Sequence, residues 1–120
     1  MISVIVNLPF PDKALWPNGR PHWAVKARAF RSHKAWAVVA MRAERPDPVS
    51  SRVAVDLTVH PKTRNRIDAD NCVSASKAYL DGIAVALGVD DSTFDAPTVT
   101  FGEPVKGGLF KVTVTYDRQA

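Results

Sequence analysis

The sequence is poor in cysteine, with Cys72 as its single thiol among 120 residues. One cysteine excludes an internal disulfide and a zinc site made of several thiolates. No apolar run approaches the roughly 18–20 residues that a membrane-spanning helix needs. The first ten residues, MISVIVNLPF, have no basic segment and no small-residue cleavage site, so we expect a strand there and not a signal peptide. These features predict a cytoplasmic protein with no membrane partner.

Several common site motifs are also missing. The chain has no glycine-rich phosphate loop and no Gly-X-Ser-X-Gly nucleophile motif. An EF-hand that started at Asp68 would need Gly at position six and Glu at position twelve, where the sequence has Val73 and Tyr79. The three histidines are scattered and lack the paired spacing of zinc ligands. Nucleotide-loop, serine-hydrolase, EF-hand and histidine-zinc chemistries are therefore excluded.

The hydrophobic fraction of 46% and the charged fraction of 23% are typical of a globular protein, and the length fits a single domain over residues 1–120. Alternating apolar residues predict strands at 2–8, 52–60, 97–103 and 109–116. Helical periodicity predicts helices at 22–44 and 69–87, and a long proline-rich loop separates the first strand from the first helix. We expect an α+β (mixed α/β) fold with a four-stranded mixed sheet and two main helices. The predicted order is strand, helix, strand, helix, strand, strand.

Charge is unevenly distributed along the chain. Seven of the sixteen Lys and Arg residues lie between Arg20 and Arg45, three more lie in 62–66, and six of the twelve acids lie in 68–95. Basic surface beside an acidic pocket suits a nucleic acid held over a metal site, although solvated surface charge gives the same pattern. The residues predicted to contact DNA are Lys62, Arg64, Arg66, Asn71, Arg20, Lys26 and Arg31.

The most informative segment is Asp68-Ala69-Asp70-Asn71, which opens the second predicted helix, with Asp90-Asp91 following that helix. Several carboxylates and Lys77 are sufficient to hold a hard divalent cation against a phosphodiester. A straight helix of about 19 residues is some 28 Å long, so the acidic pairs meet only if the chain folds back or the helix breaks, and Gly82 is a candidate break.

Purely structural roles for these residues remain open at this point. Aspartate is a preferred helix N-cap, which accounts for Asp68 or Asp70 without a metal. Asp-Asp-Ser is a common turn sequence, and Lys77 with Asp81 can be an ordinary pair on one helix face.

In these motifs the chain resembles the RusA family of Holliday junction resolvases. The similarity extends to the Leu8–Pro11 opening and to the Lys106-Gly107-Gly108 turn, so it covers nearly the whole chain. It implies a homodimeric, Mg²⁺-dependent endonuclease, with Mn²⁺ as a substitute, that nicks four-way DNA junctions symmetrically and is bacterial or phage-encoded.

By the same resemblance Asp68, Asp70 and Asp91 are catalytic metal ligands, Asp90 assists in metal binding, and Lys77 is the catalytic lysine. In the family pattern that lysine follows the asparagine by three residues, where this chain has Ser74.

Other functions are compatible with the same sequence. A related nuclease could act on a different branched DNA, and a catalytically silent DNA-binding module could keep the fold. A structural interaction protein with an acidic helix cap would be indifferent to Mg²⁺ and to DNA.

Overall fold

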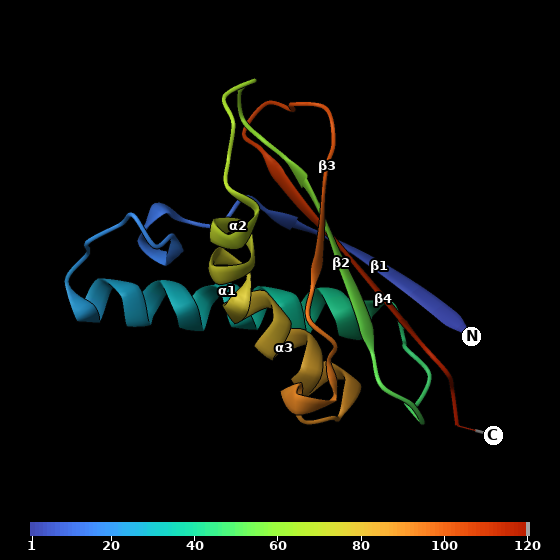
Figure 1. Cartoon of the computed structure of the whole chain (residues 1–120). Coiled ribbons are helices and arrows are strands. Elements are labelled where there is room, and N and C mark those ends of the chain that lie inside the picture. Colours follow the sequence, from blue (N-terminus) through green and yellow to red (C-terminus); the bar gives the residue numbers. More distant parts are fainter. Residues whose placement is uncertain (120) are drawn as a thin grey trace.

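The computed structural model describes residues 1–119 and has the predicted α+β fold (Figure 1). The chain forms, in order, β1 (Ile2–Pro9), η1 (Lys13–Leu15), α1 (Trp23–Ala43), β2 (Ala54–His60), α2 (Ala69–Ala75), α3 (Lys77–Leu87), η2 (Asp91–Thr93), β3 (Thr98–Phe101) and β4 (Leu109–Tyr116). The predicted order of strands and helices is confirmed, with one difference in the second helix. No helix within residues 1–119 is both long and apolar enough to cross a membrane.

The four strands form one mixed sheet in the order β1-β4-β2-β3. β4 is antiparallel to both β1 and β2, whereas β2 and β3 run parallel. The alternating apolar residues of β2 and β4 are buried, as their sequence pattern predicted. Their buried side chains pack with Ala37 and Met41 of α1 and with Tyr79 and Ile83 of α3. The core therefore lies between one face of the sheet and these two helices.

The predicted single helix at 69–87 is wrong in one respect, because the structure divides it at Ser76 into α2 and α3. Ser76 is fully buried, and its hydroxyl donates to the carbonyl of Val73 over 2.7 Å. The break is not at Gly82. A Cβ atom on Gly82 would lie 2.3 Å from the carbonyl oxygen of Lys34 in α1, so this glycine allows α1 and α3 to approach closely.

The long loop between β1 and α1 contains the short helix η1 and is attached to the helices. The backbone N–H of Asp12 donates to Nε2 of His33 over 3.0 Å, and the Tyr79 hydroxyl donates to the carbonyl of Pro9 over 2.6 Å. Because Nε2 of His33 accepts a hydrogen bond, Nδ1 must carry the ring proton, which it donates to Ala29 O at 2.8 Å. Burial lowers the pKa of His33, which favours this neutral form.

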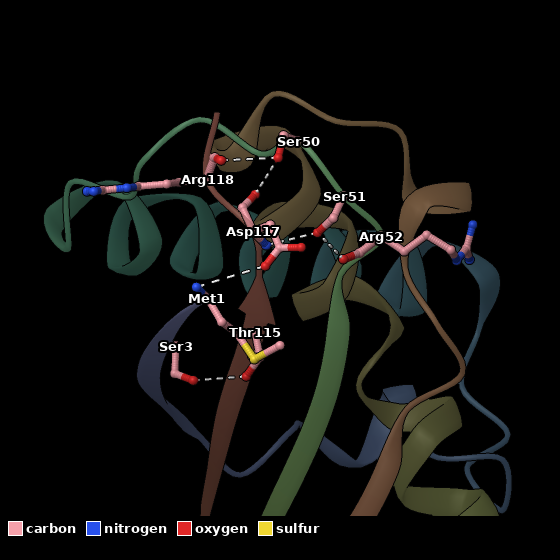
Figure 2. Close-up of polar contacts among 8 residues, drawn as sticks. All are labelled: Met1, Ser3, Ser50, Ser51, Arg52, Thr115, Asp117 and Arg118. Atoms are coloured by element: carbon pink, nitrogen blue, oxygen red, sulfur yellow. Dashed lines mark hydrogen bonds and ion pairs between the residues drawn. The ribbon is translucent and has the colours of Figure 1, made fainter. Parts of the chain in front are cut away.

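The two ends of the sheet differ. At one end, polar contacts connect Asp117 and Arg118 with the segment before β2, and Asp117 also pairs with the amino group of Met1, as Figure 2 shows. Ser50 donates to the carbonyls of Asp117 and Arg118, and the N–H of Asp117 donates to the hydroxyl of Ser51. At the other end, the segments that follow β2 and β3 emerge side by side because these strands are parallel (Figure 1). That end leads directly into α2 and its acidic residues.

Candidate active site

The first acidic group lies at the start of α2. Asp68 has an extended backbone conformation and caps the helix, and its Oδ1 accepts a hydrogen bond from the N–H of Asp70 over 2.7 Å. Asp70 lies in the first helical turn, and both carboxylates are exposed. The cap role that the sequence left open is thus real for Asp68, but this hydrogen bond occupies only one carboxylate oxygen. Burial and then the Asp68 charge raise the pKa of nearby Cys72 to about 11, so its thiol stays protonated at neutral pH.

The second group lines a pocket of about 330 Å³ between α1, α2, α3 and the segment that follows α3. Lys77, Asp81 and Asp91 line it together with Phe30 of α1 and Phe94. Lys77 is exposed and Asp81 is half-buried. They do not form an ion pair, since the two ion pairs found in residues 1–119 are Met1–Asp117 and Arg52–Asp95. The lysine ammonium group is therefore available to an anion outside the protein.

Asp90 and Asp91 have different electrostatic environments. Asp90 accepts a hydrogen bond from the N–H of Ser92 over 2.9 Å, and hydrogen bonds from Ser92 lower its pKa. The hydrogen bond with Asp90, then desolvation and the charges of Asp90 and Asp81, raise the pKa of Asp91. Asp91 thus lies in a field of negative charge that a bound cation would relieve.

The two acidic groups are not joined within one chain. No three His, Cys, Asp or Glu side chains among residues 1–119 are arranged to hold one metal ion. Asp68 and Asp70 lie where α2 begins, whereas Asp90 and Asp91 follow the end of α3 (Figure 1). The chain folds back after α3, because Asp91 lines the same pocket as Lys77, the first residue of α3, and Val73 of α2. The spacing of seven residues predicts that Lys77 shares a helix face with Asp70, but the two residues lie in separate helices, α2 and α3, divided at Ser76.

The basic segment after β2 lies at the end of the sheet that leads into α2. Lys62, Arg64 and Arg66 are exposed, and the ammonium group of Lys62 lies 5.3 Å from the centre of the Phe10 ring. Arg64 and Arg66 line a cavity of about 620 Å³, and its opposite wall contains Phe101 and Glu103. Sequence reasoning missed these last two residues because the pairing of β2 with β3 could not be predicted.

Helix α1 supplies the second basic surface. It contains Lys26, Arg28, Arg31, Lys34 and Arg42 and no Asp or Glu. The predicted contact residues Arg20, Lys26 and Arg31 are exposed, whereas Asn71 in α2 is half-buried. Trp23, the first residue of α1, is 76% exposed beside this positive charge. The structure therefore combines two acidic groups, one available lysine and two cationic surfaces.

Comparison with known proteins identifies a relative of this chain, but the description of that relative names no activity. No protein-family model matches the chain. A Xylella fastidiosa protein described as an uncharacterized protein is 36% identical over 114 residues, which cover 92% of this chain and 74% of the relative.

Proposed function

We propose that this chain, which belongs to the same family as the Xylella fastidiosa protein, is a metal-dependent endodeoxyribonuclease that resolves four-way DNA junctions by paired, symmetric nicks. The observation that supports this most strongly is the pocket shared by Lys77, Asp81 and Asp91. It combines an available cation with carboxylates that repel one another, and it accompanies the motifs that resemble the RusA family.

The carboxylates fit Mg²⁺, or Mn²⁺ in its place, because hard divalent cations prefer oxygen ligands. Asp68, Asp70 and Asp91 would hold the cation with help from Asp90. The carboxylates of Asp90 and Asp81 lie close enough to Asp91 to contribute to its raised pKa, after the hydrogen bond with Asp90 and desolvation, and a cation would neutralise their charge. Such a cation, when bound, polarises a phosphate and lowers the pKa of a water.

The other residues act on the DNA itself. Lys77 is available to stabilise the additional negative charge that develops on the phosphate during hydrolysis. The exposed cations contact backbone phosphates and set the position of the DNA without reading its sequence. These positioning residues are Lys62, Arg64, Arg66, Arg20, Lys26 and Arg31, with Asn71 beside the acidic group.

We further propose that the active form is a homodimer. Two symmetric nicks require two sites related by a two-fold axis. A second copy also provides a way to bring Asp91 near Asp68 and Asp70, which one chain keeps in separate groups. The DNA and Mg²⁺ that this reaction needs are both present in bacterial cytoplasm, where we place a bacterial or phage-encoded enzyme.

The alternative is a branched-DNA-binding protein that does not cleave or that cleaves a different structure. Two observations favour it: residues 1–119 contain no ready three-ligand metal group, and Lys77 is displaced from the family position. This alternative predicts that the protein binds the four-way junction tightly but yields no Mg²⁺-dependent cleavage product.

The deciding experiment compares a labelled four-way junction with a linear duplex of the same sequence, in Mg²⁺ and in EDTA. We expect paired, Mg²⁺-dependent nicks in the junction alone. Asp70→Asn should abolish the nicks and spare junction affinity, because it removes a metal ligand but no phosphate contact. Asp47→Asn, at an exposed carboxylate outside both acidic groups, should behave like wild type.

Undiminished turnover by Asp70→Asn would refute the carboxylate assignment. Wild-type protein that binds the junction tightly and never nicks it would favour the silent binding module.

A further inference from the structure

A cavity of about 620 Å³ lies between the segments that follow β2 and β3. This volume is within the range of roughly 300–1,000 Å³ typical of ligand sites. Its walls include Pro61, Arg64 and Arg66 on one side and Phe101, Glu103 and Pro104 on the other. It lies beyond the carboxyl ends of the two parallel strands β2 and β3.

Hydrogen bonds hold the two walls in place. The N–H of Gly102 donates to the carbonyl of Val59 over 2.9 Å, and the N–H of Val105 donates to the carbonyl of Pro61 over 3.0 Å. The His60 ring bonds to the carbonyl of Glu103 through Nδ1 at 2.8 Å. A Cβ on Gly102 would lie 2.4 Å from that ring, so the absence of a side chain there gives the ring its space. The cavity is therefore built by defined contacts between two distant segments.

The lining chemistry suits a flat aromatic ligand attached to a phosphate. Phe101 is 48% exposed, which leaves ring surface for stacking. Arg64 and Arg66 can contact phosphate oxygens. Glu103 on the facing wall repels a phosphate but can accept a hydrogen bond from a base edge. A nucleotide with its base inside and its phosphate toward the arginines satisfies all four residues.

The position of the cavity connects it with the proposed chemistry. Ile67 lines the cavity, and the next residue is Asp68, the cap of α2. A base in the cavity would thus belong to a nucleotide adjacent to the phosphate near Asp68 and Asp70.

We infer that this cavity binds one unstacked base of a branched DNA strand, with the Phe101 ring as the stacking surface and Arg64 and Arg66 on the flanking phosphates. The inference rests on the proposed function, because it takes DNA as the substrate. It assigns recognition to Phe101 and Glu103, which act on the base and not on the metal.

The test measures affinity in EDTA, so that cleavage does not intervene, for an intact four-way junction and for junctions with one abasic site at each nucleotide beside the branch. Loss of one stacked base should weaken wild-type binding about 5- to 150-fold at one of these positions. Phe101→Ala should weaken binding of the intact junction by a similar factor and should then be insensitive to that abasic site. Phe101→Tyr keeps the ring and should restore the sensitivity.

Two further variants separate this effect from general damage. Ile5→Ala removes an apolar side chain that is 47% exposed on β1, at the opposite edge of the sheet, and should behave like wild type. Arg64→Ala should weaken the intact and abasic junctions equally, because it contacts a phosphate in both.

Equal abasic-site sensitivity in wild type and Phe101→Ala would overturn the inference. If Asp70-dependent nicking persists in that case, the nuclease proposal survives alone. If Phe101→Ala removes the sensitivity to the abasic site but no variant or wild-type protein nicks the junction, the base-binding cavity is supported and the nuclease proposal is rejected. Absence of DNA binding by wild type would reject both.

Discussion

Replacing Gly82 by alanine tests the close packing of α1 against α3. The added Cβ would lie 2.3 Å from the carbonyl oxygen of Lys34 and 2.8 Å from the Cβ of Ala37. Ordinary contact begins at 3.4 Å, so the helices would have to separate by about 1 Å. Ala37 and Ile83 at this contact are completely buried, which leaves no flexible side chain to absorb the change.

Two effects of opposite sign determine the free energy of unfolding. Alanine is favoured over glycine inside a helix by about 1 kcal/mol. Overpacking of a well-filled core costs about 1–3 kcal/mol, and a clash with a backbone carbonyl belongs at the upper end. We therefore expect Gly82→Ala to lower the free energy of unfolding by about 1–2 kcal/mol, equivalent to a Tm decrease of roughly 4–8 °C for a chain of this size.

Urea unfolding and thermal denaturation measure this change directly. The matched control is Val85→Ala, which alters a 46% exposed side chain of the same helix and should change the free energy of unfolding by no more than about 0.5 kcal/mol. Because α3 carries Lys77 and Asp81, Gly82→Ala should also reduce junction cleavage at temperatures where the protein is folded. A variant as stable as wild type would show that α1 and α3 are not in close contact at Gly82.

Three shorter predictions concern the site and its support. Lys77→Ala should slow junction cleavage with little change in affinity; activity restored by adding Ser74→Lys would instead locate the catalytic lysine on α2. Arg64→Ala should reduce the slope of log affinity against log salt by about 0.9, the value for one phosphate contact, and an unchanged slope would exclude that contact. The pKa of His33 is lowered in the folded protein, so the unfolded chain takes up the proton first as pH falls below 6.5. The free energy of unfolding should therefore be smaller at pH 5.5 than at pH 7.5, and the difference should shrink in His33→Gln; an equal decrease in both proteins would contradict it.

Much of the fold could be predicted because its periodic signals are strong. Val53, Val55, Leu57 and Val59 alternate with Ala54, Asp56 and Thr58, and all four apolar side chains are buried in the structure. The helix break at Ser76 gave a weaker signal, since apolar residues at helical spacing (Cys72, Ala75, Tyr79 and Ile83) continue through it. A serine hydroxyl that bonds to the preceding turn can bend a helix, and the buried Ser76 has that hydrogen bond. Gly82 was the more obvious candidate, but its small size serves packing against α1 and not a break.

The candidate site was only partly predictable, for a physical reason. The acidic residues and Lys77 are recognisable because they lie in one short segment of sequence, but helical spacing did not predict their arrangement, since the helix divides at Ser76. The cavity between residues 61–67 and 101–104 depends instead on parallel pairing of β2 with β3, in which Val59 is opposite Phe101. Nothing in the alternation of either strand specifies its neighbour or its direction, because both arrangements bury the same face. Phe101 reads from the sequence as one more apolar strand residue, and only the pairing places its exposed ring across from Arg64 and Arg66. Side chains at a strand end are therefore placed by sheet order, whereas those at a helix start can be placed from sequence spacing.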